Sequence, residues 1–105
     1  MTEVKIFSDG NTIIGFSISG HSSVNCDDEE GKLVCSAVSS AAIMTANTIT
    51  DIIGDKADIK VSDAKLSLKV KKPNEKTVAV LEGLRLHLEQ LSNEYKDRIS
   101  ILSEV

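Results

Sequence analysis

Apolar and polar residues alternate through the first part of the chain, which is the pattern of half-buried β-strands. One alternating run covers residues 4–8, and the next covers residues 14–18. The segment Asp9-Gly10-Asn11 between them is a strong turn sequence, because Gly and Asn tolerate the backbone conformations of tight hairpin turns. The pattern therefore predicts a β-hairpin, and Gly20-His21 follows directly after it.

The next segment, residues 33–53, carries its apolar and small residues at helical spacing, and Gly54 after it is a typical helix stop. The pattern predicts one helix over this segment. Most side chains of the stripe are short, which allows the helix to pack closely on a sheet. The stripe consists of Val34, Val38, Ala41, Ala42, Thr45, Ile49 and Ile52.

The second half of the chain repeats this arrangement of strands before a helix. Residues 59–61 and 66–70 alternate around the turn sequence Ser62-Asp63-Ala64, which predicts a second hairpin. Pro73-Asn74 opens a second helix that ends near Lys96-Asp97, and residues 99–103 form a last strand. The apolar face of this helix consists of Leu81, Leu84, Leu88, Leu91 and Tyr95.

These elements follow one another in the order ββαββαβ, and each helix has a single apolar stripe. The order predicts an α+β two-layer sandwich in which both helices pack on one face of a mixed or antiparallel sheet. The chain has 105 residues, 41% of them hydrophobic, so we expect a single domain covering residues 1–105. Because only 3% of the residues are aromatic, the core must consist mainly of aliphatic side chains.

The charge of the chain argues against direct binding of nucleic acid. The formal net charge is −4, whereas nucleic-acid-binding proteins usually present a basic face to the phosphates. One basic cluster occurs, at Lys65, Lys69, Lys71 and Lys72, and we expect it to be a solvated surface. The acidic run Asp27-Asp28-Glu29-Glu30 instead suits a basic protein partner.

The N-terminal segment gives an expectation about location. Residues 1–9 mix charged and apolar residues and do not resemble a signal peptide. No apolar run approaches the roughly 18 residues of a membrane span, so the sequence predicts a cytoplasmic protein without a membrane partner. In the cytoplasm Cys26 and Cys35 should be reduced, and a structural disulfide is not expected.

His21 and Cys35 are the candidate catalytic residues. A thiol in the first turn of a helix faces unpaired backbone N–H groups and the positive end of the helix dipole, which favour the nucleophilic thiolate. We therefore expect Cys35 to be the nucleophile and His21 its general acid and base. The backbone N–H groups of Cys35 and Ser36 would stabilise the oxyanion. The alternative is that Cys35 is a small buried core residue.

The residues between this pair are polar and predict an exposed loop. Gly20 would allow a substrate backbone to approach closely, and Gly20 and Gly31 could be the hinges of a lid. A loop without any gating role is the alternative. Cys26 is expected to be a bystander in this loop, although it could oxidise with Cys35 and silence the site.

The order of these motifs resembles the ribosomal-processing cysteine protease family of bacteria. The resemblance lies in Gly20-His21, Gly31 and Leu33-Val34, in Cys35-Ser36-Ala37-Val38-Ser39, and in residues 81–95 with Gly83-Leu84. It implies a homodimeric endopeptidase that removes an N-terminal extension from large-subunit ribosomal protein twenty-seven, at a site preceded by aromatic residues. Many relatives have Asp where this chain has Lys32, so which carboxylate, if any, orients His21 stays open.

Two other kinds of function remain open. His21, Cys26 and Cys35 could bind zinc, but their spacing lacks the close cysteine pair of structural zinc sites, so we expect no metal and no cofactor. A non-catalytic module could instead bind a ribosomal protein or an assembly factor through the same cleft. His87, on the second helix, is expected to be a partly exposed surface residue.

Overall fold

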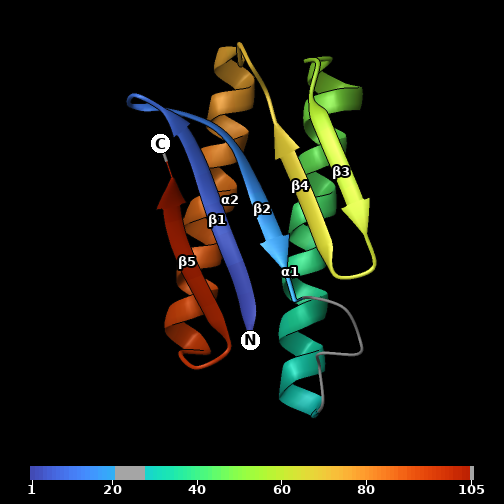
Figure 1. Cartoon of the computed structure of the whole chain (residues 1–105), viewed down its shortest axis with the longest axis vertical. Helices are drawn as coiled ribbons and strands as arrows, with labels where there is room; N and C mark the ends of the chain where they lie inside the picture. The colour runs from blue at the N-terminus through green and yellow to red at the C-terminus, as the bar shows by residue number, and fades with distance from the viewer. Residues whose placement is uncertain (21–27, 105) are drawn as a thin grey trace.

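The computed structural model describes residues 1–20 and 28–104, and its elements follow the predicted order ββαββαβ (Figure 1). A short π-helix, η2, continues α1. The elements are β1 (Thr2–Asp9), β2 (Thr12–Ser19), α1 (Glu29–Asn47), η2 (Thr48–Ile53), β3 (Asp58–Ser62), β4 (Lys65–Lys69), α2 (Glu75–Glu94) and β5 (Ile99–Glu104).

The strands form one five-stranded mixed sheet in the order β3-β4-β2-β1-β5. The pairs β3–β4, β4–β2 and β2–β1 are antiparallel, whereas β1 and β5 are parallel. Both helices lie on the same face of the sheet (Figure 1), because each has one apolar stripe to bury. The predicted α+β sandwich is therefore confirmed.

The core lies between the helices and this face of the sheet. Phe16 is the only aromatic side chain among the fully buried residues of the described chain, as the composition led us to expect. The rest of the core is aliphatic and comes from every strand except β3 and from both helices. The largest fully buried aliphatic side chains are Val4, Ile6, Ile13, Ile18, Val34, Val38, Ile49, Leu68, Val70, Leu81 and Leu88.

Gly15 allows β2 and β4 to approach each other closely. It pairs with Lys69, and a Cβ at this position would lie 2.1 Å from the carbonyl oxygen of Leu68. No side chain fits at that distance, so only glycine preserves the pairing. This pairing fixes the register of β2, whose last residue precedes Gly20-His21.

Helix α1 begins at Glu29, four residues earlier than predicted. Asp28 is the N-cap residue, and its side chain accepts a hydrogen bond from the backbone N–H of Gly31. Glu29 and Glu30 occupy the first turn, where negative charge interacts favourably with the helix dipole. The helical segment ends as predicted, at Gly54, which has a left-handed backbone conformation with φ of 84°.

By length and composition, the segment Glu29–Ile53 is the one described helical segment apolar enough to cross a membrane, with a mean hydropathy of 1.4. The expectation that no segment is long and apolar enough to span a membrane is therefore wrong, as judged by length and composition. Core helices of soluble proteins pass the same criterion, and α1 contributes Val34, Val38 and Ala42 to the core. However, only 39% of the apolar window is buried, so α1 has a large exposed face.

Candidate active site

Cys35 lies in the second turn of α1 and is partly buried. Its neighbours Val34 and Val38 point into the core and fix the orientation of the helix. Ser36, the next residue, is exposed and lines a hollow on the helix surface. Cys35 therefore sits at the boundary between the core and the exposed face of α1.

The expected position of Cys35 in the first helical turn is wrong, because α1 begins at Glu29. The backbone N–H of Lys32 already donates to the carbonyl of Asp28 at 2.9 Å, which starts the helical hydrogen-bond ladder before Cys35. Inside an α-helix, each N–H donates to the carbonyl four residues earlier. In this conformation the N–H groups of Cys35 and Ser36 are thus part of the ladder and are not the unpaired oxyanion donors that were expected.

Arg98, directly before β5, holds the start of α1 in place. Its Nη2 lies 2.6 Å from Oδ2 of Asp28, and its Nε lies 3.3 Å from Oε1 of Glu30. The hydrogen bond from the Arg98 guanidinium, together with the one from the Gly31 N–H, lowers the pKa of Asp28 below its ordinary value. The same ion pair raises the pKa of Arg98.

These two ion pairs, here called the Arg98 clamp, involve two of the four residues of the acidic run Asp27-Asp28-Glu29-Glu30. Asp28 and Glu30 both bind Arg98, and Asp28 also caps the helix. The sequence analysis did not identify Arg98 as part of this region. Nothing in the local pattern could have done so, since Arg98 is separated from Asp28 by 70 positions in the chain.

Gly20 marks the point where the chain leaves the sheet toward His21. Its φ is 76°, and a Cβ at this position would lie 2.7 Å from the carbonyl oxygen of Met1. Its N–H donates to the carbonyl of Ala64 at 2.8 Å, which ties the end of β2 to the β3–β4 turn. Glycine is therefore required here by both its backbone conformation and the surrounding space.

The other expected hinge, Gly31, is not in a loop. It is buried in the first turn of α1, with its N–H bonded to Oδ1 of Asp28 at 2.7 Å. The hinge prediction is therefore wrong for Gly31. His21 and Cys26 lie outside the described residues, as does most of the expected loop.

The sulfur of Cys35 is in a disulfide in this structure. The expectation that both cysteines of the chain are reduced is therefore not met at Cys35. A disulfide sulfur is no nucleophile, because attack on a carbonyl requires the thiolate. Any thiol chemistry at Cys35 thus needs prior reduction.

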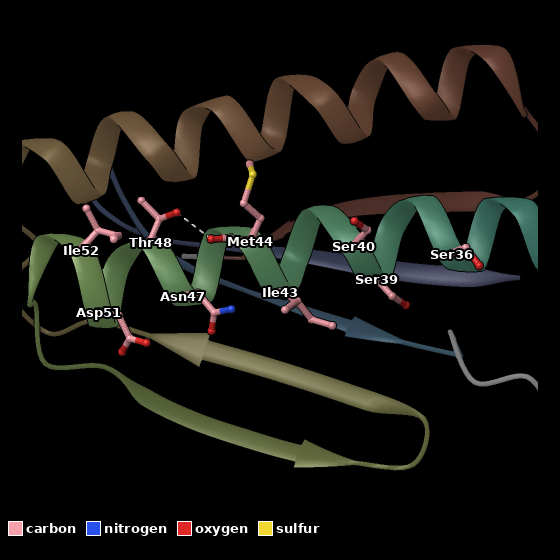
Figure 2. A pocket seen from close by; sticks show the side chains of 9 residues that line it. All are labelled: Ser36, Ser39, Ser40, Ile43, Met44, Asn47, Thr48, Asp51 and Ile52. Atoms are coloured by element: carbon pink, nitrogen blue, oxygen red, sulfur yellow. Dashed lines mark hydrogen bonds between the residues drawn. The ribbon is translucent and has the colours of Figure 1, made fainter.

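A hollow of about 560 Å³ opens beside Ser36 at the start of α1. Two acidic, one basic, one hydroxyl, one apolar and one aromatic side chain line it, namely Glu29, Glu30, Lys32, Leu33, Ser36 and Tyr95. Its size is in the range of pockets that bind a small molecule or a short stretch of peptide. A second, shallow hollow of about 770 Å³ shares Ser36 and continues along α1 (Figure 2).

Within residues 1–20 and 28–104, no group of three His, Cys, Asp or Glu side chains could hold a metal ion. The zinc alternative is not tested by this result, because it requires His21 and Cys26. His87 is exposed, as expected for a surface histidine, and lines a groove between α1 and α2.

Comparison with known protein families identifies the chain. The model of the family described as cysteine protease Prp matches residues 1–100. The chain belongs to this family. Because the family consists of cysteine proteases, the chain is a cysteine protease. The resemblance seen in the Gly-His and Cys-Ser-Ala-Val-Ser motifs is confirmed. No curated protein matches the sequence.

Solved structures with the same fold cover nearly all of the chain. An essential ribosomal processing protease Prp from S. aureus, in complex with a substrate peptide, is 18% identical with a TM-score of 0.88, and 99% of this chain and 100% of that chain are covered. The same S. aureus protein with a covalently linked product peptide is 20% identical, with a TM-score of 0.82 and coverage of 99% and 100%. SMU.848 from Streptococcus mutans is 17% identical, with a TM-score of 0.84 and coverage of 99% of each chain.

Proposed function

We propose that this chain is a cytoplasmic endopeptidase that removes the N-terminal extension from large-subunit ribosomal protein twenty-seven, a step required for ribosome assembly. The observation that carries the proposal is the match of the cysteine protease family model over residues 1–100. The S. aureus structure with the same fold is described as a ribosomal processing protease and holds a substrate peptide, which supports the choice of substrate class.

In the proposed reaction, reduced Cys35 is the nucleophile and His21 is its acid and base. The Cys35 thiolate attacks the carbonyl carbon of the scissile bond, and the carbonyl oxygen becomes an oxyanion. His21 donates its proton to the leaving amine as the C–N bond breaks, which leaves an acyl group on Cys35. His21 then takes a proton from water, whose oxygen attacks the thioester and releases the second product.

Stabilisation of the oxyanion by the N–H groups of Cys35 and Ser36 requires a change at the start of α1. These groups lie inside the helical ladder, so the turns from Glu29 to Leu33 would have to open before they could donate to substrate. The Arg98 clamp opposes this opening, because it binds Asp28 and Glu30. In this proposal, substrate binding opens the first turns of α1.

The charge of the chain supports a basic peptide as partner. The net charge is −4, and Glu29 and Glu30 line the hollow beside Ser36. Ribosomal precursors are basic, so long-range attraction would bring them to this end of α1. We further propose that the enzyme acts as a homodimer, without metal or cofactor, and that neither nucleic acid nor a membrane is a partner.

The test is cleavage of a synthetic peptide that covers the extension of the host's ribosomal protein, with products identified by mass spectrometry in the presence of a thiol reductant. We expect the wild-type protein to cut one bond. Cys35→Ala and His21→Ala should each abolish cleavage, because each removes one member of the pair.

Ser39→Ala is the matched control, since Ser39 lies one turn further along the same helix and has no role in the proposed chemistry. Retained activity of Cys35→Ala would exclude Cys35 as nucleophile. Tight binding of the peptide without cleavage by the reduced wild-type protein would support the non-catalytic binding module instead.

A further inference from the structure

Four lysine side chains gather where two connecting segments of the fold meet. One segment links η2 to β3, and the other links β4 to α2. Both segments lie at the end of the molecule opposite the start of α1 (Figure 1). A hollow of about 660 Å³, here called the lysine hollow, is lined by Lys56 from the first segment and by Lys69, Lys71 and Lys72 from the end of β4 and the second segment.

The fold creates this group of lysines, because it divides the cluster seen in the sequence. Lys65 belongs to that cluster, but it begins β4, whereas Lys69 ends it. Lys65 pairs with Ser62 beside the β3–β4 turn and does not line the hollow. Lys56 joins the group from a different part of the chain. All four lysines of the hollow are exposed, so a ligand can reach their ammonium groups.

The lysine hollow carries more positive than negative charge. Its lining also contains Asp55 and Asp58, so four lysines face two carboxylates and the excess is two positive charges. The Asp55 carboxylate already accepts hydrogen bonds from the N–H of Asn74 and the hydroxyl of Thr77. Among the residues that the structure describes, none of the four lysines forms an ion pair. The excess is therefore not neutralised by contacts within the described chain.

Lys69 is held in place by an aromatic ring. Its Nζ lies 4.5 Å from the centre of the Phe7 ring, a cation–π contact. Gly15 pairs with both residues and lies between them in the sheet, so the Lys69 side chain crosses β2 where no side chain blocks it. The charge of Lys69 thus acts on the hollow from its edge. Lys56, Lys71 and Lys72 remain for direct contact with a ligand.

Backbone N–H groups of the two segments supply further donors. The N–H of Val70 donates to the carbonyl of Ile14 at 2.8 Å, where β4 leaves the sheet. In the part of the chain that the structure describes, the N–H groups of Lys71 and Lys56 donate to no backbone carbonyl. An N–H without a protein acceptor binds an oxygen of water or of a ligand. Each segment therefore offers an N–H donor in addition to its ammonium groups.

We propose that the lysine hollow is a binding site for a phosphate dianion, with Lys56, Lys71 and Lys72 around its oxygens. A dianion balances the excess of two positive charges, whereas a single carboxylate would leave one of them uncompensated. Lysine is a common phosphate ligand, because its ammonium group is a compact point charge. A volume of about 660 Å³ is typical of small-molecule sites and leaves room for an organic group that carries the phosphate.

A nucleic-acid strand fits the lysine hollow less well than a single phosphate group. A strand needs a continuous basic track and exposed aromatic rings on which its bases stack. Here Asp9 and Glu104 line the adjoining hollow, which shares Lys69 and Lys71, so carboxylates interrupt the basic surface. The Phe7 ring in that hollow is already covered by Lys69. The positive surface is therefore compact.

The test is isothermal titration calorimetry with ribose 5-phosphate, inorganic phosphate and uncharged ribose. At about pH 7.5 a phosphate monoester is mainly a dianion, because its second pKa is about 6. We expect both phosphates to bind and ribose not to bind. The double variant Lys71→Gln with Lys72→Gln should bind both phosphates at least about tenfold more weakly, because it removes two of the three direct contacts.

The matched control is the double variant Lys60→Gln with Lys65→Gln. It removes the same charge from two exposed lysines of the β3–β4 hairpin that do not line the hollow. Its affinity should stay within about twofold of wild type, since distant exposed charges are screened. Thermal unfolding of both double variants would verify that each one folds.

The comparison of the two phosphates identifies the source of the ligand. Tighter binding of ribose 5-phosphate would support the site and show that the organic group is also bound. Equal binding would support it as a site for free phosphate. No binding of either phosphate at millimolar concentration, or an equal loss in the control variant, would overturn the proposal.

Two polyanions complete the titration. Binding of a single-stranded oligonucleotide that tightens with its length would overturn the phosphate site by assigning the lysines to nucleic acid. Preference for hexaglutamate over both phosphates would overturn it by assigning them to an acidic protein segment. The inference does not depend on the proposed protease function, because the lysine hollow lies at the opposite end of the molecule from the start of α1 (Figure 1). Failure of phosphate binding would leave peptide cleavage untouched.

Discussion

Arg98 and Asp28 form an ion pair of 2.6 Å that joins the start of the last strand to the N-cap of the helix carrying Cys35. The backbone of Arg98 is itself held in the sheet, because its carbonyl accepts a hydrogen bond from the N–H of Thr2 at 2.8 Å. The sheet and the start of α1 are thus connected through one side chain. If α1 must open for catalysis, Arg98 controls how easily it opens.

Replacing Arg98 by alanine should loosen the first turn of α1 and change catalysis more than stability. The pair is at the surface, where a single ion pair contributes little to global stability. We expect amide exchange of residues 29–33 to become at least about threefold faster and kcat/KM to change, while the melting temperature stays nearly constant. Arg85→Ala is the control, because Arg85 forms a comparable surface pair with Glu82 on α2.

The disulfide state of Cys35 predicts a redox-dependent activity. Cleavage should be absent from protein prepared without a thiol reductant and should return when one is added, because only the thiolate attacks a carbonyl. The chain has one other cysteine, Cys26, so Cys26→Ser should stay active under mild oxidation. Equal peptide cleavage by oxidised and reduced wild type would contradict Cys35 as nucleophile.

Two glycine substitutions should have opposite effects on stability. Gly20→Ala should lower the free energy of unfolding by at least about 1 kcal/mol, since Gly20 has a positive φ and no room for a Cβ beside Met1. Gly83→Ala should raise it by about 1 kcal/mol, because Gly83 lies within α2 and a Cβ there meets nothing within 4 Å. Urea unfolding followed by circular dichroism measures both changes.

Acid should weaken the connection between α2 and the loop after η2. Asp55 accepts hydrogen bonds from the hydroxyl of Thr77 and from the N–H of Asn74, the latter at 2.8 Å, and these bonds lower its pKa. Because the folded pKa lies below the unfolded value of about 3.9, this contribution is present above about pH 4 and disappears as the pH falls through the folded pKa.

Thermal unfolding as a function of pH would reveal this dependence. Asp55→Asn should lower the melting temperature at pH 7 and flatten its decline between about pH 4 and 2, since the variant lacks the titrating group. An unchanged pH profile in Asp55→Asn would show that other carboxylates, such as Asp28, dominate acid unfolding.

The fold followed from the sequence because its signals are local. Alternation over residues 4–18 and 66–70 reports strands with one buried face, and the leucines of α2 report one buried helical stripe. Residues 59–61 alternate as well and do form part of β3, but this strand is exposed throughout. The start of α1 was missed because the acidic run was interpreted as a loop. The sequence nonetheless contains a signal for this helix start, since an Asp followed by two Glu is a favourable N-terminus of a helix.

The site was less predictable, because its geometry depends on residues far apart in the chain. The motif around Cys35 identified the family, but the position of Cys35 within the helix depends on where Asp28 caps it. Arg98 carries no local signal, and its role follows only from the fold. The exposed apolar face of α1 was likewise not predicted, because Leu33, Ile43 and Met44 lie outside the predicted apolar stripe. Ile52 was assigned to the stripe but is 79% exposed.

The parallel pairing of β1 with β5 also affects the order of events during synthesis. Strand β1 cannot form its parallel pairing until β5 has been made, and the Arg98 side chain that binds the start of the Cys35 helix is translated long after that helix. While the chain is still being elongated, the helix that carries Cys35 therefore lacks this support. A peptidase built in this way acquires its finished cleavage site only after nearly all of residues 1–104 have been translated.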